Sequence, residues 1–205
     1  MQFDITDSPV PSISLPELDS AAERHPLLVA AFLNQLEECR QLIEDDYAAS
    51  GVNANKNDAL MCASQCGHTD VCRYLIDFGA DVNYQNDNSA SPIFVAVTAG
   101  NIETCSLLLT RGADVNVILP DGATPLFIAA QTGNREIATL LLGHDADSSS
   151  RRSDGAVPLH IAAQYGHVDV CRILLQFNAK VDATNNAGLT SLHLAAFNDK
   201  LQVCK

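Results

Sequence analysis

Blocks of apolar residues alternate with polar stretches along this chain in a cycle of 33 residues. In residues 122–154, an apolar block at 126–130 follows Thr124-Pro125, Gly133 interrupts it, and a second block ends at 140–142. Thr can accept hydrogen bonds from the free amides of a helix start. Pro at the first helical position gives up an N–H that has no partner. Each cycle therefore predicts two short helices followed by a polar connection.

Three rows of residue types keep this period along the chain. The first row is proline-rich, the second is cysteine-rich and the third is glycine. Their members are Pro26, Ala59, Pro92, Pro125, Pro158 and Ser191; Cys39, Cys72, Cys105, Ala138, Cys171 and Cys204; and Gly67, Gly100, Gly133 and Gly166. A fixed period of this size indicates a stack of small units, each unable to bury its own apolar face.

Three strings within these units resemble the ankyrin repeat. They are Thr-Pro-Leu at 124–126, Val-Pro-Leu-His-Ile-Ala-Ala at 157–163 and Gly-Ala-Asp-Val-Asn at 112–116. The family has a 33-residue period and a T-P-L-H-x-A string. The resemblance covers residues 22–205 and implies an all-α solenoid of helix-turn-helix units with projecting, hairpin-like fingers.

The resemblance also suggests how the chain is organised. We expect a flexible, acidic, proline-containing tail at 1–20 and a repeat array at 21–205. Its units are predicted at about 22–55, 56–88, 89–121, 122–154 and 155–187, with a truncated unit at 188–205. The period marks Cys204 as a buried position, yet nothing follows it to cover it. We therefore expect that the chain is a fragment of a longer protein.

Several units depart from the repeat pattern. The first lacks a Gly-Ala-Asp-Val-Asn string, so residues 45–57 predict a longer second helix and a shortened finger, with a stop at 51–53. The next helix is expected to start at Asp58-Ala59. Second helices should end in a left-handed residue at Gly79, Gly112 and Asn178. Asp145 suits that conformation less well and predicts a less regular end.

Composition limits the partners and the compartment. The net charge of −13 disfavours nucleic acid, whose phosphates need basic surface. The sequence has no run of 18 apolar residues and no signal peptide, so no membrane insertion is expected. The evenly spaced cysteines read as small buried core residues in a reducing compartment, cytoplasmic or nuclear. We expect a monomer.

Candidate chemistry is sparse. Nucleophile, phosphate-loop and metalloprotease motifs are absent from the sequence. Cys62, Cys66 and His68 form a metal-like cluster, but with three ligands and no paired C-x-x-C spacing they predict no metal site. No cofactor or enzymatic activity is therefore expected. The alternative is a regulatory ankyrin segment of a larger enzyme or channel whose active part lies beyond residue 205.

The predicted function is a protein-protein interaction scaffold or adaptor that binds another protein through its concave face and finger tips. The apolar string Val117, Ile118 and Leu119 predicts an exposed contact patch, and the alternative is that this finger buries it. The other candidate contacts are Tyr84 and the basic pair Arg151 and Arg152 on fingers, and Gln131, Gln164 and Tyr165 along the first helices.

Two asparagines have a separate interpretation. Asn83 and Asn116 each follow Asp-Val, a context similar to asparaginyl hydroxylation sites in ankyrin proteins. The favoured interpretation is that their side chains brace the finger backbone.

Overall fold

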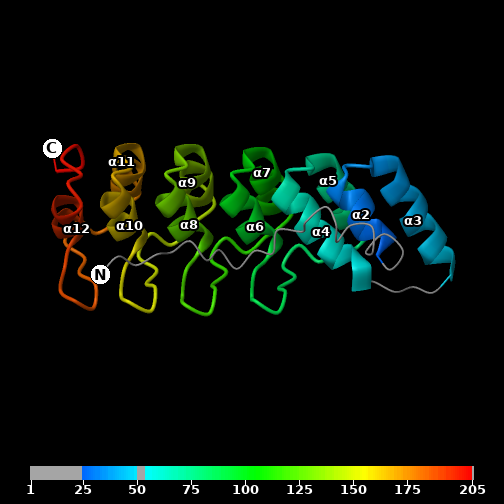
Figure 1. The fold of residues 1–205 in the computed structure, drawn as a ribbon, viewed down its shortest axis with the longest axis horizontal. Helices are drawn as coiled ribbons and strands as arrows, with labels where there is room; N and C mark the ends of the chain where they lie inside the picture. Colours follow the sequence, from blue (N-terminus) through cyan, green and yellow to red (C-terminus); the bar gives the residue numbers. More distant parts are fainter. Residues whose placement is uncertain (1–24, 50–53, 205) are drawn as a thin grey trace.

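The computed structural model describes residues 25–49 and 54–204, and its helices are labelled as in Figure 1. Eleven helices lie in this described part. They are α2 (Pro26–Phe32), α3 (Leu36–Ala49), α4 (Ala54–Cys66), α5 (Thr69–Asp77), α6 (Pro92–Ala99), α7 (Ile102–Thr110), α8 (Pro125–Thr132), α9 (Arg135–Leu142), α10 (Pro158–Tyr165), α11 (Val168–Gln176) and α12 (Ser191–Phe197). None of these helices is long and apolar enough to cross a bilayer.

The helices form two rows. Helices α2, α4, α6, α8, α10 and α12 pack one against the next, and α3, α5, α7, α9 and α11 form a second row beside them. Figure 1 shows an elongated array with connecting loops that project to one side. These loops are the second finger (residues 80–90), the third (113–123), the fourth (146–156) and the fifth (179–189). The predicted all-α solenoid is confirmed.

The first helices begin and end as their sequences predict. Pro92, Pro125 and Pro158 each open an eight-residue helix after a residue with extended backbone. The Thr124 side chain accepts a hydrogen bond from the Phe127 amide at 3.2 Å, which satisfies one amide of the first turn. Gly133 ends α8 in the left-handed conformation. Short helices of constant length follow from these two signals.

A left-handed residue follows α5, α7, α9 and α11 at one equivalent position. Gly79, Gly112 and Asn178 have φ values of 91°, 86° and 63°. Asp145 also takes this conformation, with φ 64°, and the Ala146 amide then donates to the Leu141 carbonyl at 3.1 Å. The bond matches those of Ala80, Ala113 and Ala179 in the other units. Asp145 can do so because a short polar side chain tolerates this conformation. Helix α9 nevertheless ends one residue earlier than α5, α7 and α11, which agrees with the less regular end expected in the fourth unit.

Helix α3 of the first unit has the predicted length, whereas the next helix, α4, does not begin where predicted. Helix α3 has 14 residues, which confirms the longer second helix. Helix α4 begins at Ala54 rather than at Asp58, so the predicted start is wrong. The added turn is held in place because Lys56 is buried there and its ammonium group donates to the Phe78 carbonyl at 3.3 Å. The expected stop at 51–53 lies outside the described residues.

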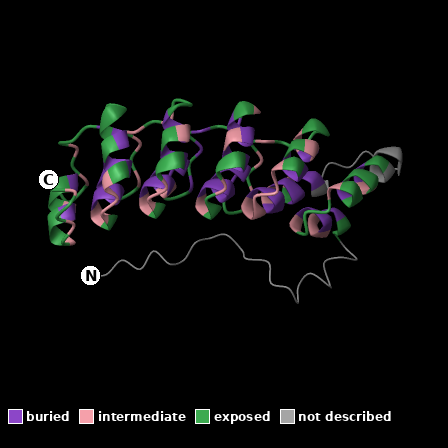
Figure 2. Cartoon of the chain, turned by 90° about the horizontal axis from the view of Figure 1, so that it is seen from above, coloured by how far each residue is buried: buried purple, intermediate pink, exposed green. Residues whose placement is uncertain are grey.

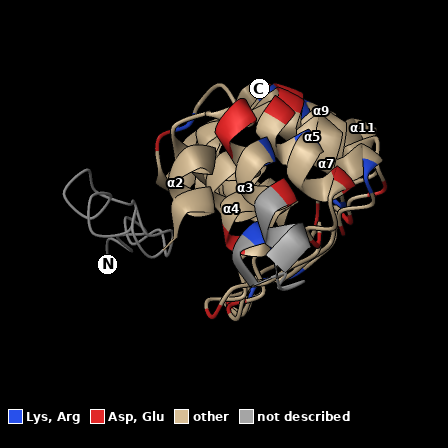
Figure 3. Ribbon diagram, turned by 90° about the vertical axis from the view of Figure 1, so that its right-hand side faces the viewer, with Lys and Arg blue, Asp and Glu red and all other residues tan. Residues whose placement is uncertain are grey.

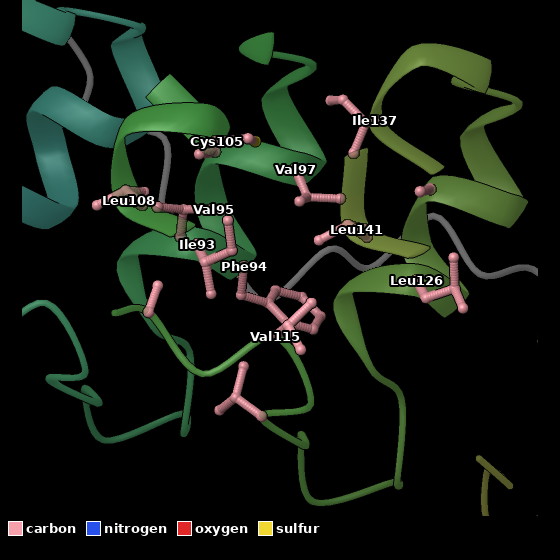
Figure 4. Packing of buried hydrophobic residues seen from close by; sticks show 14 of the residues in the cluster. Ile93, Phe94, Val95, Val97, Cys105, Leu108, Val115, Leu126, Ile137 and Leu141 are labelled. Carbon is pink, nitrogen blue, oxygen red and sulfur yellow. The ribbon is translucent and has the colours of Figure 1, made fainter. Parts of the chain in front are cut away.

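The core lies between the two helix rows and runs along the array. Figure 2 shows buried residues where helices face one another, and Figure 4 shows part of the cluster around α6, α7, α8 and α9. Cys39, Cys72, Cys105 and Cys171 lie in this core, as the period predicts. Burial raises the pKa of the Cys105 thiol to about 12, so the thiol stays protonated.

In the last unit, the described residues form no second helix that could cover the core positions. Residues 201–204 form turns instead of a second helix, and Cys204 is exposed. Cys204 thus keeps the period of the core cysteines without their burial. The period predicts burial only where a neighbouring helix packs over the position, and no described helix does so here.

Candidate protein-binding surface

The ends of the first helices are tied to the next unit by polar side chains. The His68 ring bonds the Phe32 carbonyl at 2.9 Å, and the Asn101 amide donates to the Gln65 carbonyl at 2.9 Å. In the fifth unit the His167 ring bonds the Gln131 carbonyl at 3.0 Å. His68 thus has a structural role, and no group of metal-ligating residues is found in the described part of the chain.

The bases of the fingers are joined by asparagine side chains. The Asn83 amide group accepts from the Asp114 amide at 2.7 Å and donates to the Gly112 carbonyl at 3.1 Å. Asn116 makes the equivalent bonds with Asp147 and Asp145 at 2.9 and 3.3 Å. The bracing role predicted for Asn83 and Asn116 is confirmed. Neighbouring fingers are therefore held at a fixed spacing near their bases.

The third finger buries most of its apolar tip. Val117 and Leu119 are only 6% and 8% exposed, whereas Ile118 is 60% exposed. The expectation of a contiguous exposed patch is wrong, because Val117 and Leu119 are buried and do not offer surface contacts. Burial alternates from one residue to the next along 113–120, so successive side chains face the core and the solvent in turn. The buried residues Ala113, Val115, Val117 and Leu119 alternate with the exposed residues Asp114, Asn116, Ile118 and Pro120. Because Ile118 and Pro120 are also apolar, the residue types around the tip do not by themselves separate the two sides.

The basic pair of the fourth finger is engaged within the array. The Arg152 guanidinium lies 4.7 Å from the centre of the Phe127 ring and forms an ion pair with Asp154. This hydrogen-bonded pair holds the pKa of the Asp154 carboxyl below its usual value. Arg151 donates to the carbonyls of Gly155 and Thr184 at 2.9 and 2.8 Å, which links the fourth finger to the fifth. The expected free basic spot is thus largely neutralised.

Tyr84 is also engaged. Its hydroxyl donates to the Asp58 carboxylate at 3.3 Å and connects the second finger to α4. Partial burial, and after it the neighbouring Asp58 charge, raises the pKa of Tyr84. The side chain therefore helps to position the second finger.

The C-terminal ends of α8 and α10 carry the other predicted contacts. The first six residues of α10 are buried, whereas Gln164 is partly exposed and Tyr165 is 40% exposed. The Tyr165 ring stacks on His167 with 6.1 Å between ring centres and an angle of 8°. Because His167 also bonds the Gln131 carbonyl, Gln131 and Tyr165 belong to one local arrangement.

The fourth finger lies near this arrangement. The pKa of Arg152 is raised first by its hydrogen bond to Asp154 and then by the nearby negative charges of Asp154 and Asp121. The Arg152 guanidinium lies over the Phe127 ring, and Phe127 is four residues before Gln131 on α8. The structure therefore links Gln131 to Tyr165 through His167 and places the fourth finger over α8, the helix that carries Gln131. Tyr84 lies at another part of the array. We call Gln131, Gln164 and Tyr165, with the adjoining fourth finger tip, the Tyr165 surface.

Charge changes along the array. The second and third fingers each carry two aspartates and no basic residue, whereas the fourth balances two aspartates with two arginines. Residues 1–102 hold fifteen acidic and four basic side chains, against ten and eight in residues 103–205. Figure 3 shows acidic positions on the helical side and at the finger tips. The Tyr165 surface thus lies in the less acidic half.

Comparison with known proteins gives the family. No curated protein matches the chain. A family model described as ankyrin repeats (3 copies) matches residues 14–86, 79–152 and 126–205, and so spans the described array. Such repeats are generally protein-protein interaction modules and typically are not enzymes. With its 33-residue period, its two helix rows and its projecting fingers, this chain belongs to the ankyrin-repeat family.

Proposed function

We propose that this chain is a protein-binding module, a scaffold or adaptor, whose partner lies against the Tyr165 surface. The observation that carries the proposal is the position of Tyr165. It is an aromatic side chain, 40% exposed, at the end of a helix whose first six residues are buried. Large amphipathic rings held in place before binding are typical anchors of protein interfaces, because little conformational entropy is lost on contact.

The surrounding contacts support this choice. The stack on His167 orients the ring, and Gln131 and Gln164 are partly exposed and carry amide groups that can donate and accept hydrogen bonds. The nearby fingers are fixed because the Ser153 amide donates to the Asp121 carbonyl at 2.7 Å. A preorganised surface with one aromatic anchor and a polar border has the composition of a protein interface.

Other predicted contacts have smaller parts in this proposal. Ile118 remains a single exposed apolar residue and a secondary contact. Tyr84, Arg151 and Arg152 support the fingers through their internal bonds. The buried thiol row supports a reducing intracellular compartment, and we propose that the chain acts there as a monomer.

A site-specific crosslinking experiment tests the proposal. A photoreactive residue replaces Tyr165 in the full chain, and a matched control replaces Arg172, which is exposed on the second-helix row. The crosslinked protein is identified and purified, and its affinity is measured for wild type, Tyr165→Ala and Arg172→Ala. Tyr165→Ala should weaken binding by about thirtyfold, the effect of losing a hot spot of ~2 kcal/mol. Equal affinities for all three proteins, with unchanged folding, would reject the Tyr165 surface.

A further inference from the structure

The C-terminal ends of the first helices form two rows of accessible positions along the array. Helices α6, α8, α10 and α12 pack one against the next, so residues 33 positions apart on them are neighbours in space (Figure 1). Each position in these rows is exposed or partly exposed. We call the two rows the uncharged strip; its members are Thr98 and Ala99, Gln131 and Thr132, Gln164 and Tyr165, and Phe197 and Asn198.

The strip contains no charged residue, although the chain as a whole has a net charge of −13. Its side chains end in methyl, hydroxyl, amide or aromatic groups. Charge begins at the border, where the stem of Lys200 packs so closely on Gly166 that a Cβ at position 166 would lie 2.9 Å from the Lys200 Cδ. A partner that buried a charge against the strip would lose its hydration without gaining an ion pair. The residues of a partner that contact the strip are therefore uncharged.

The spacing of the strip selects the conformation of an extended partner. Axes of packed helices lie about 8–10 Å apart. A polyproline II segment rises ~3.1 Å per residue with three residues per turn, so every third side chain returns to one side after ~9.3 Å. A β-strand returns after two residues and ~6.8 Å, which does not match the units. An α-helix needs about seven residues and ~10.5 Å. Polyproline II thus fits best, with one contact for each unit.

The side chains of the strip also suit such a segment. A polyproline II backbone has no internal hydrogen bonds, so its carbonyl groups can accept bonds from a partner. Gln131 and Gln164 are partly exposed and can donate such bonds. Tyr165 and Phe197 are 40% and 87% exposed, and aromatic rings of this kind line the surfaces on which proline-rich segments dock. Charge, spacing and side-chain chemistry therefore favour the same kind of partner.

We propose that the partner of the Tyr165 surface presents an uncharged, proline-containing segment in the polyproline II conformation, which runs along the uncharged strip. This inference rests on the proposed function and adds the chemistry of the partner. A proline or aliphatic side chain lies on the Tyr165 ring, and the residues three positions before and after it contact the neighbouring units. Because the segment is already stiff when free, it loses little conformational entropy on binding.

A peptide selection tests this with the full chain. Displayed random peptides of about twelve residues, enough for four units at three residues each, are selected on wild type, and those that also bind Tyr165→Ala are removed. The enriched peptides should contain proline and uncharged contact residues. In an alanine scan of one such peptide, every third position should lower the affinity by about tenfold and the others by less than about twofold.

Salt and charge variants provide the controls. The affinity of the peptide should change by less than about twofold between ~50 and ~500 mM NaCl, because the contact contains no ion pair. Thr132→Lys and Thr132→Glu place either charge in the strip, and both should weaken binding by about tenfold. Arg172→Glu changes an exposed charge on α11, outside the strip, and should leave binding unchanged. Circular dichroism checks that each variant is folded.

Two kinds of outcome overturn the inference. Peptides that require Tyr165 but are rich in Lys or Arg and bind more weakly at high salt would contradict it, as would contacts at every second or every seventh residue. In these cases the Tyr165 surface stands and only the assigned partner chemistry fails. If no enriched peptide requires Tyr165, the inference also fails, and the crosslinking experiment at Tyr165 then decides the proposed function by itself.

Discussion

The third and fourth fingers have the same backbone and opposite side-chain chemistry. In each, the residue before the turn bonds to the residue after it, at 3.0 Å from Leu119 and 2.9 Å from Arg152. Leu119 belongs to the apolar core cluster together with Phe94, whereas Arg152 lies over the Phe127 ring and pairs with Asp154. Each pair of positions, 119 with 94 and 152 with 127, is separated by the same 25 residues.

This comparison teaches that the inner side of a finger accepts two kinds of contact. An apolar side chain packs in the core, or a guanidinium stacks on the aromatic ring below while a carboxylate neutralises it. In both arrangements the side chain is engaged within the array and is not available to a partner. Apolar or basic residues in a finger therefore do not by themselves identify a partner site.

The largest expected effect separates the two sides of the third finger. Val117→Asp places a charge at a buried position and should lower the free energy of unfolding by about 2–4 kcal/mol. Ile118→Asp is the adjacent control on the exposed side and should change it by no more than about 0.5 kcal/mol. Urea denaturation of both variants measures the difference. Similar values for the two would mean that Val117 is not held in the core.

A smaller effect extends the comparison to the fifth unit. His160 occupies the position of Phe94 and Phe127, is fully buried, and bonds the Leu189 carbonyl at 3.0 Å. Burial lowers the pKa of His160 below the value of about 6.5 expected in the unfolded chain. The unfolded chain then binds more protons, so this contribution to stability is present above pH ~6.5 and is lost as the pH falls.

Denaturation at pH 7 and pH 5 measures this contribution. The decrease in stability between these two values should be smaller for His160→Phe than for wild type, because Phe cannot be protonated. His144→Gln, at an exposed histidine, is the control and should retain the wild-type decrease. An unchanged decrease in His160→Phe would show that His160 is not the group that responds.

The smallest effect comes from making the fourth finger resemble the third. Arg152→Leu replaces a cation over the Phe127 ring and a partly exposed ion pair by an apolar contact. Each removed interaction contributes no more than about 1 kcal/mol, and the new contact offsets part of it, so stability at pH 7 should change by less than ~1 kcal/mol.

The same variant changes the response to acid. Arg152 lowers the pKa of Asp154, so its contribution is present above the unfolded value of about 3.9 and is lost as the pH falls through the lowered value. In Arg152→Leu, the loss of stability between pH 5 and pH 3 should become shallower than in wild type. A loss above ~2 kcal/mol at pH 7 would instead show that the fourth finger depends on its arginine.

The sequence by itself determined the repeat, the helix positions and the buried thiol row. These features depend on local signals: proline at helix starts, left-handed residues at helix ends, and small or apolar residues every 33 positions. The 14-residue α3 was also predictable, because the first unit lacks the string that ends other second helices. The start of α4 at Ala54 was not, because the burial of Lys56 is a tertiary contact that extends the helix beyond its local start signal.

Only the tertiary structure decided which predicted contact residues remain free. Val117 and Leu119 are apolar in the sequence whether they face the core or the solvent, and Arg152 is basic whether or not Phe127 and Asp154 engage it. Asp145 adopts the left-handed conformation of glycine, and Cys204 keeps the period without a helix to cover it. A repeat period specifies equivalent backbone positions. The exposure of a side chain depends in addition on what the neighbouring units place against it.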